Sequence, residues 1–482
     1  MKVLVLIPPS KYTRNVARDL LYGCWCGGKR IAGTQFPPIS QVLVATVLNK
    51  RGHSAELIDA SALGMTLTEL KEKVLQERYA AVIVLTSTMT VNEDAYILRE
   101  LKKVRDLTTI CFGSHATFMP QATLQKEGID VVVRREAEFI IRDLIDALDA
   151  GRDYKSIKGI GYKDKGDIVV NEYYHFIENL DELPFPDRKL LTPGVYYFNP
   201  VVKKMPFTTM FTSRGCPGKC TFCSSPSFYG RKIRYRSAAS ILEEIEVIRS
   251  QGYREIFFRD EIFTVSKKRT WEVCEGILRK GIPLSWIASS RLDYIDYEMM
   301  QIMKRAGCHM LRFGVESGVQ SVLNAVKKDI NIDQTRKVFE WAHEIGIDTH
   351  AHLMIGMPTD TPRTIRETVD FVKRIDPTIV TFGICTPYPG TELFELVKSI
   401  FPEVEDGSAC NLSNLHIKGF YNKVYCDVDP DELSGYVRMA YKEFYLRFSY
   451  LVKWVKRVKS LDELKRVLMA GLYVTEFVFG KK

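Results

Sequence analysis

The segment Arg214-Gly-Cys-Pro-Gly-Lys-Cys-Thr-Phe-Cys223 carries three cysteines, Cys216, Cys220 and Cys223, on one short stretch. It follows an expected strand at 208–212, and α/β-barrel active sites gather at the carboxyl ends of strands. Three thiolates on one loop can hold three corners of an iron–sulfur cube, whereas electron-transfer clusters usually have four cysteine ligands. Zinc, the competing metal, would need a fourth ligand that no nearby Cys or His supplies.

Strand and helix signals alternate after this segment. Further strands are expected at 255–258, 284–288, 310–315, 349–354 and 379–384, and helices at 241–250, 271–280, 334–345 and 363–374. Six strands in series, most followed by a helix, predict a partial or full TIM-type (β/α) barrel over residues 206–400.

Residues 1–150 show the same alternation. Strands are expected at 2–7, 55–58, 80–85, 109–112 and 129–133, and helices at 39–48, 66–78, 92–105 and 138–150. This pattern predicts a Rossmann-like, doubly wound parallel sheet. Such a sheet binds ligands beyond the carboxyl ends of its strands.

Two regions differ from this α/β pattern. Residues 151–205 contain an expected hairpin near 164–167 and a proline-rich stretch, and they are interpreted as a connector between domains. Residues 401–482 are expected to be mostly helical, with a second helix starting at Ser460 and Glu463 completing a capping box. The first helix has an aromatic and apolar stripe of Tyr441, Phe444, Tyr445, Phe448, Leu451, Val455 and Val458.

The composition is that of an ordinary folded protein, with 46% hydrophobic and 26% charged residues. A net charge of +9 permits anionic ligands or a membrane surface without demanding nucleic acid, and no nucleic-acid partner is expected. The apolar start of the chain stops at Pro8 and lacks a signal-peptide pattern. Eleven cysteines are then better explained as metal ligands or buried thiols in a reducing cytoplasm than as disulfides.

The CxxxCxxC spacing, with Phe222 before the third cysteine, resembles the signature of the radical SAM superfamily. The resemblance implies a 4Fe-4S cluster whose open iron is chelated by S-adenosylmethionine (SAM), and release of a 5′-deoxyadenosyl radical. It also implies an external electron donor of the ferredoxin or flavodoxin type. Motifs after successive expected strands match the family in order. The implied SAM-binding residues are Phe222, Asp260, Glu261, Arg291, Glu316, Ser317, Gly356 and Pro358.

The first 150 residues resemble the cobalamin-binding domain of the cobalamin-dependent radical SAM enzymes. The matching motifs are PPS, GSHAT and RREAE after the first, fourth and fifth expected strands. The implied cobalamin-binding residues are Pro9, Ser87, Thr88, Gly113, Ser114, His115 and Glu138. No Asp-x-His-x-x-Gly motif is present in this region, so no protein histidine is expected on cobalt. His53 is expected to be an exposed turn residue.

Three further residue groups leave alternatives open. Cys24 and Cys26 either line the lower face of the corrin or are free thiols beside a buried tryptophan. His350 and His352 fall on one face of an expected strand and are candidates for substrate contact if that face points inward. The basic C-terminal helices either contact a membrane surface, to reach a lipid-like substrate, or pack on the barrel with their lysines in solvent.

The resemblance implies a methyltransferase that adds the methyl group of methylcobalamin to an unactivated carbon of a small molecule, after the 5′-deoxyadenosyl radical has removed a hydrogen. One alternative is a cyclase or rearrangement enzyme with the same cofactors, as in tetrapyrrole or hopanoid ring formation. Another is a non-catalytic cobalamin sensor or carrier. The substrate itself cannot be identified from one sequence.

Overall fold

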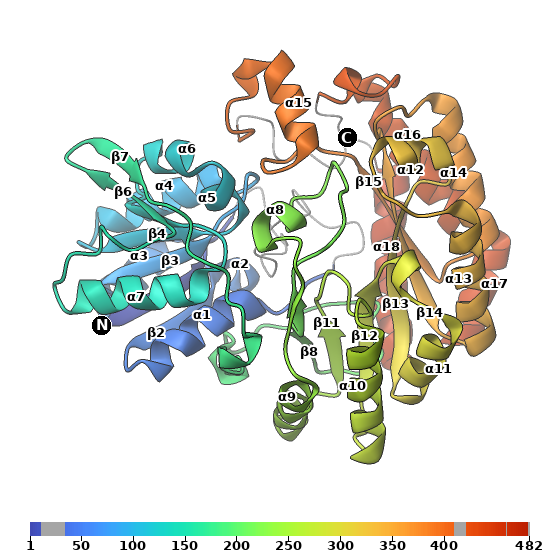
Figure 1. The fold of residues 1–482 in the computed structure, drawn as a ribbon, viewed down its shortest axis with the longest axis horizontal. Coiled ribbons are helices and arrows are strands. Elements are labelled where there is room, and N and C mark those ends of the chain that lie inside the picture. Colours follow the sequence, from blue (N-terminus) through green and yellow to red (C-terminus); the bar gives the residue numbers. More distant parts are fainter. Residues whose placement is uncertain (11–33, 409–420, 459, 481–482) are drawn as a thin grey trace.

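The computed structural model describes residues 1–10, 34–408, 421–458 and 460–480. Two α/β units lie side by side, each built on its own sheet, and a group of C-terminal helices packs against the second (Figure 1). Helix α8 (Ser225–Tyr229) lies between the two units (Figure 1). The expected α/β fold is confirmed.

The first sheet is doubly wound, as predicted. Its parallel strands have the order β2-β1-β3-β4-β5. They are β1 (Lys2–Ile7), β2 (Ser54–Asp59), β3 (Ala81–Leu85), β4 (Thr108–Phe112) and β5 (Val131–Val133). The winding direction reverses between β1 and β3, so the ligand crevice of such a sheet lies beyond the carboxyl ends of these two strands.

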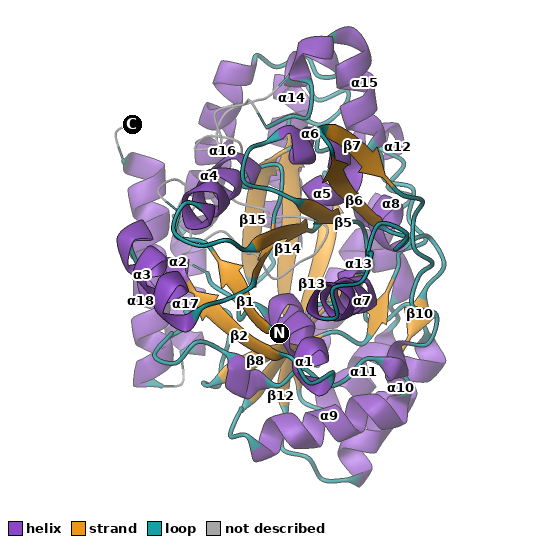
Figure 2. Ribbon diagram, turned by 90° about the vertical axis from the view of Figure 1, so that its left-hand side faces the viewer, coloured by secondary structure: helices purple, strands orange, loops and turns teal. Residues whose placement is uncertain are grey.

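Helices cover both faces of this sheet (Figure 2). They are α1 (Ile39–Lys50), α2 (Ala60–Leu63), α3 (Leu67–Glu77), α4 (Val91–Lys102), α5 (Ser114–Phe118), α6 (Pro120–Gln125) and α7 (Ala137–Asp149). Alternate strand residues point to opposite faces. Val3 and Val5 therefore join the apolar core under α1 and α7, while Leu4 and Leu6 join the core under α3 and α4.

The hairpin expected in the connector extends the first sheet. β6 (Ile160–Asp164) pairs antiparallel with β5 and with β7 (Asp167–Val170). Ile160 and Tyr162 are buried in the same core as α1 and α7. The first sheet thus continues beyond residue 150.

The second sheet is a partial barrel of six parallel strands in the order β15-β14-β13-β12-β11-β8. The strands are β8 (Phe207–Met210), β11 (Glu255–Phe258), β12 (Ser285–Ser290), β13 (Cys308–Glu316), β14 (Asp348–Ile355) and β15 (Ile379–Ile384). The helices after them include α9 (Ala238–Ser250), α10 (Lys267–Arg279), α11 (Tyr297–Arg305), α12 (Gln320–Ala325), α13 (Ile332–Ile345), α14 (Pro362–Ile375) and α15 (Glu392–Ile400).

The two faces of the barrel sheet differ in what they bury. Outward residues such as Phe258, Trp286 and Phe313 form the main core with the surrounding helices. Inward residues near the amino ends of the strands, including Phe257 and Met310, form a separate small apolar cluster. This cluster is called the floor below.

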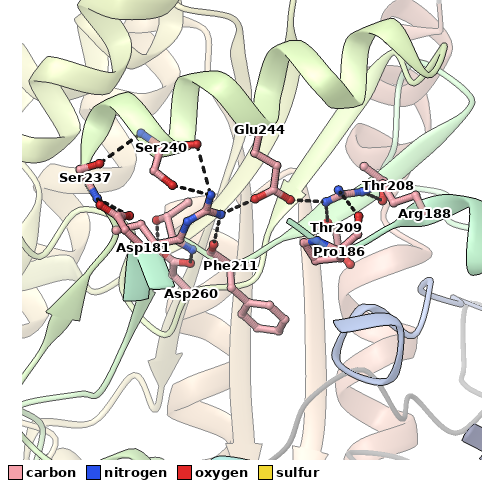
Figure 3. Close-up of polar contacts among 12 residues, drawn as sticks. Asp181, Pro186, Arg188, Thr208, Thr209, Phe211, Ser237, Ser240, Glu244 and Asp260 are labelled. Atoms are coloured by element: carbon pink, nitrogen blue, oxygen red, sulfur yellow. Dashed lines mark hydrogen bonds and ion pairs between the residues drawn. The ribbon is translucent and has the colours of Figure 1, made fainter. Parts of the chain in front are cut away.

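The connector is fixed to the barrel by a buried ion triad (Figure 3). Arg188 donates to Glu244 on α9 over 2.7 Å and to Thr208 on β8 over 2.9 Å. Arg236 donates to the other carboxylate oxygen of Glu244 and to Ser240. The charged ends of all three ionic side chains are almost fully buried.

The C-terminal helices are α16 (Pro430–Tyr445), α17 (Phe448–Arg457) and α18 (Leu461–Phe479). The Tyr445 hydroxyl donates to the carbonyl of Val380 over 2.6 Å and accepts from its N–H, so α16 satisfies backbone groups of the edge strand β15. The expectation of one helix that carries the whole stripe from Tyr441 to Val458 is wrong. The helix breaks after Tyr445, and Phe448 is 82% exposed.

The side chains of Leu451 and Val455 in the same expected stripe lie outside the described residues. The helix expected to start at Ser460 is α18. Ser460 caps its first turn, where the Ser460 hydroxyl accepts from the N–H of Glu463. Among the described helices, none combines the length and the apolarity needed to cross a bilayer.

Removing the central charge of the ion triad should destabilise the barrel. Glu244→Gln leaves two buried arginines without their carboxylate, and breaking a buried pair typically costs about 3–5 kcal/mol. The exposed neighbour Glu243 provides a matched control, Glu243→Gln, with an expected effect within about 0.5 kcal/mol. The urea midpoint measures the difference, and equal midpoints for the two variants would contradict this role.

Candidate functional site

The loop that carries the three cysteines is closed at its base by a two-stranded ladder. β9 (Ser213–Arg214) pairs antiparallel with β10 (Arg234–Tyr235), and the N–H of Cys216 donates to the carbonyl of Gly230. Gly215 has a φ of +101°, and a Cβ at this position would lie 2.4 Å from a backbone carbonyl oxygen. Only glycine fits here, which explains the residue before Cys216.

The three cysteine thiols are near neighbours on the loop. A Cβ added at Gly218 would lie 3.4 Å from Sγ of Cys216 and 3.8 Å from Sγ of Cys220. Burial raises the pKa of Cys216 to about 11, and burial together with the other two thiols raises the pKa of Cys223. Thiols in this setting need the positive charge of a metal to ionise. Three of them on one loop fit an iron–sulfur cluster with an open corner.

No set of three or more His, Cys, Asp or Glu side chains in the described parts of the chain is arranged around a single metal ion. The thiols lie close enough to influence one another's pKa without converging on one ion.

Charged groups lie around the thiols. Burial raises the pKa of Glu261 to about 8, and its carboxylate acts electrostatically on Cys216. On the other side, Lys328 donates to Glu316 over 2.6 Å. Glu316 ends β13 with a φ of +63°, an unusual conformation for a non-glycine residue. A buried carboxyl such as Glu261 ionises readily when an ammonium group approaches, so it fits the amino group of SAM.

Two of the expected SAM contacts are turned into the protein instead. Asp260 accepts from the N–H of Thr212 over 2.6 Å and from the hydroxyl of Ser213 over 2.8 Å. The Ser317 hydroxyl lies 3.1 Å from that of Thr368 on α14. These side chains fix the loops after β8 and β13, and their polar atoms are already engaged.

Arg291 also differs from expectation. Its Nε and Nη2 each donate to Asp293 over 2.9 Å, so this edge of the guanidinium is not open to a bidentate SAM carboxylate. Nη1 instead faces Sγ of Cys220 at 3.8 Å. Arg291 is thus placed to stabilise negative charge on the cysteine loop.

An apolar wall adjoins the loop. Phe222 packs in a cluster with Met357 and Cys385. Gly356 has a φ of +74°, and its carbonyl accepts from the Asn422 side chain over 2.9 Å. Pro358 follows and is half-buried. A flat apolar ring, such as the adenine of SAM, is the kind of group that this wall suits.

Sequence reasoning missed Lys328 and Asn422. Both lie outside any recognisable motif, on segments brought to the site only by tertiary packing. A lysine or asparagine in an unpatterned loop gives no local signal.

The expected cobalamin loops lie together at the carboxyl ends of β3 and β4. His115 is fully buried, with Nδ1 3.0 Å from the Thr88 hydroxyl and Nε2 3.2 Å from Asp406. Burial lowers the pKa of His115. Both of its ring nitrogens have protein partners. The Ser87 N–H donates to Thr90, which closes the same loop.

Other expected contacts are distributed at this edge. Gly113 has a φ of +110°, and Ser114 begins α5 with a partly exposed side chain. Pro9 follows β1 and is partly exposed. Cys24 and Cys26 lie outside the described residues.

Two expectations about the first unit are corrected. Glu138 was expected to contact cobalamin, but both of its carboxylate oxygens accept from Arg214. His53 was expected to be exposed, but its side chain is only 5% exposed because Nε2 pairs with Asp146 at 2.9 Å. In both cases the side chain pairs with a charged residue distant in sequence.

The same carboxylates join the two units beside the cysteine loop. Glu136 pairs with Arg234 at 2.7 Å and with Arg214 at 3.2 Å, and Glu138 also pairs with Arg214. All four side chains are at most 5% exposed. Although burial opposes it, the two carboxylates raise the pKa of Arg214. We call these four residues the interdomain clamp.

Helix α8 completes the joint. It begins just after Cys223, and Phe228 and Tyr229 at its end are buried in the core of the first unit. The Phe228 ring lies 6.2 Å from that of Phe118, near edge-to-face. The cysteine loop is therefore held between a ladder of the barrel and the core of the first sheet.

Comparisons with known proteins agree with this architecture. The model of the radical SAM superfamily matches residues 210–372, and that of the B12 binding domain matches residues 30–145. An uncharacterized methyltransferase of Pyrococcus horikoshii is 31% identical over 466 residues, which cover 94% of each chain. The chain belongs to the cobalamin-dependent radical SAM enzymes, whose cofactors are a 4Fe-4S cluster, SAM and cobalamin.

A second relative and a solved structure are also similar to this chain. The anaerobic magnesium-protoporphyrin IX monomethyl ester cyclase of Rubrivivax gelatinosus is 27% identical over 88% of this chain and 76% of its own. The structure of OxsB, a cobalamin-dependent SAM radical enzyme with aqua-cobalamin and SAM bound, superposes with a TM-score of 0.70 at 16% identity. That match covers all of this chain and 73% of OxsB, and it shows the fold.

Loss of one clamp carboxylate should loosen the cysteine loop. Glu138→Gln removes charge from a fully buried pair, so we expect a loss of about 3–5 kcal/mol and less iron bound per chain after anaerobic reconstitution. Glu127→Gln, on the exposed surface of the same unit, should leave both quantities unchanged. Thermal melting and iron analysis test this. A Glu138→Gln protein with the iron content and melting temperature of the control would argue against the clamp.

Proposed function

We propose that this enzyme methylates an unactivated carbon of a small molecule. The strongest support comes from the contact between the two units. The interdomain clamp and α8 hold the cysteine loop beside the unit that matches the B12 binding domain. The Pyrococcus horikoshii relative, which matches this chain over 94% of its own length, is described as a methyltransferase. When bound, the cluster with SAM supplies a one-electron radical source, and cobalamin supplies a methyl group.

We propose residue roles at the cluster from the contacts above. Cys216, Cys220 and Cys223 hold three irons, and Arg291 offsets negative charge at Cys220. Glu261 receives the amino group of SAM. The Lys328–Glu316 pair would also lie beside SAM.

We extend the proposal for SAM to the apolar wall of Phe222, Gly356 and Pro358, which would hold the adenine. Asp260 and Ser317 act by holding the loops in place.

We propose that cobalamin lies over the loops after β1, β3 and β4. Pro9, Ser87, Thr88, Gly113 and Ser114 are at these loops. His115 would support them from beneath, since both its nitrogens are engaged within the protein. Glu138 serves the clamp instead.

The proposed division of the chain follows the same lines. Residues 1–150 form the cobalamin-binding domain, to which the hairpin of the 151–205 connector adds two strands. Residues 206–400 form the radical SAM barrel, and 401–482 form the helical region. An electron donor of the ferredoxin or flavodoxin type would reduce the cluster.

A cyclase activity is the second candidate, because the Rubrivivax relative with the same two domains is described as a cyclase. Retention of the methyl group separates the two. Holoenzyme is incubated with SAM that carries a deuterated methyl group, a reductant and a small-molecule extract of the source cells. We expect deuterated methyl in a product made by wild type and absent with Cys220→Ala. Deoxyadenosine formation with unlabelled new products would favour the cyclase.

We also propose that the C-terminal helices contact a membrane surface. Along α18, Leu461, Leu468, Leu472 and Phe479 recur at helical spacing and are 58–79% exposed. An apolar stripe of this kind suits the boundary between headgroups and acyl chains.

Flotation with anionic liposomes at low salt tests the membrane contact. Leu472→Glu should weaken binding by roughly tenfold or more, since burying one leucine contributes about 1.5–3 kcal/mol. Leu75→Glu, at an exposed leucine of α3, should bind like wild type. The idea fails if wild type does not float, or if both variants float equally well.

A further inference from the structure

One layer of the barrel's inner face is polar and cationic, directly above the apolar floor. Arg312 on β13 is in register with His350 on β14, and His352 lies two residues further along the same strand. Arg259 follows β11. The guanidinium groups of Arg259 and Arg312 lie 5.2 Å and 5.1 Å from the ring centroid of Phe257, the floor residue, so both cations sit over the floor.

The hydrogen bonds of this layer fix the state of one imidazole. Nη2 of Arg312 lies 2.8 Å from Nε2 of His352. A guanidinium only donates, so Nε2 of His352 accepts and its proton is on Nδ1. The two histidine rings lie 4.1 Å apart between centroids. Nε2 of His350 is 2.7 Å from the Thr381 hydroxyl. As expected for an inward face, the two histidines are brought together inside the barrel.

His350 has unused hydrogen-bonding capacity. Its side chain is more than nine-tenths buried, and its Nδ1 has no hydrogen-bond partner among the described residues. A buried polar atom left in this state is unfavourable, and a hydrogen bond to a ligand atom would offset that cost. Because Nε2 can accept from the Thr381 hydroxyl, Nδ1 can carry a proton and donate it in a hydrogen bond.

The electrostatic field of the layer is positive. Burial lowers the pKa of His352 well below its ordinary value, and His350, Arg312, Lys328 and Arg259 lower it further. Burial and Arg312 lower the pKa of His350 in the same way. Neutral imidazoles among guanidinium groups form a site that prefers an oxyanion, because charge-assisted hydrogen bonds to carboxylate or phosphate are the strongest that these groups make.

We propose that Arg259, Arg312, His350 and His352 bind a carboxylate or phosphate group of the substrate and thereby set which carbon faces the cofactors. This inference rests on the proposed function, since it concerns the substrate of the same site. The Lys328 ammonium group lies beside Gly314, two residues beyond Arg312 on β13 and in register with His352, so the layer adjoins the Lys328–Glu316 pair. The substrate would place its anionic group on the floor side of this pair and its reacting carbon toward the cysteine loop.

Anion titration of the holoenzyme tests this proposal. Anaerobically reconstituted protein is saturated with SAM, so that the SAM site is filled, and is titrated by calorimetry with inorganic phosphate and, separately, with acetate. Wild type should bind at least one of them, and Arg312→Gln should weaken that binding tenfold or more. Arg363→Gln, which removes a charge from a side chain that is 85% exposed on α14, should bind like wild type.

The outcomes separate the sources of the anion. Binding of phosphate alone indicates a phosphorylated substrate, binding of acetate alone a carboxylic acid, and binding of both a site for either. Failure of wild type to bind either anion, or equal binding by Arg312→Gln, overturns the proposal.

Arg312→Lys is the control for a folding defect in Arg312→Gln. It keeps the positive charge, so it should retain more anion binding than Arg312→Gln, with the same cluster absorbance in both variants. An equal loss of anion binding in the two variants would indicate that Arg312 has only a structural role and would contradict the anion site. None of these titrations requires turnover, so a failure here leaves the methyl-transfer experiment to be judged by itself.

Discussion

The architecture of the site depends on the buried contact between Arg214 and the carboxylates of Glu136 and Glu138. Arg214 is separated from Cys216 only by a glycine that no other residue can replace, so the ion pairs of Arg214 hold the chain next to the first cysteine. Burial of these charges is tolerated because each carboxylate faces a guanidinium. Helix α8 adds an apolar anchor in the same place. The loop is therefore a shared part of both units, which fits a reaction that uses the cofactors of both.

The inner face of the barrel changes in character along its strands. The floor is apolar, the next layer holds arginines and histidines, and the cysteine loop closes the carboxyl end. A radical intermediate is protected when its surroundings are dry and its substrate is held firmly. An apolar floor and, above it, a cationic layer that anchors the substrate as proposed would meet both needs. The helical region contributes as well, because Asn422 holds the carbonyls of Gly356 and Cys385, after β14 and β15.

Local patterns allowed most of the fold to be predicted. The alternation of strands and helices, the hairpin and the cysteine loop all follow from residues close in sequence. Partners distant in sequence could not be predicted. Glu138 is the last residue of a motif expected at the corrin, but it pairs with Arg214, and the pairing of β6 with β5 has no local signal. Asp260 was placed in the correct loop, but motif order does not determine which way a side chain points.

The three neighbouring thiols are expected to hold a cluster that cleaves SAM beside bound cobalamin. The most direct measurement is deoxyadenosine release by anaerobic protein reconstituted with iron, sulfide and cobalamin, then given SAM and a strong reductant. Wild type should bind about four irons per chain and release deoxyadenosine, and Cys220→Ala should do neither. Wild-type protein that carries its full iron content and cobalamin yet releases no deoxyadenosine would contradict the account.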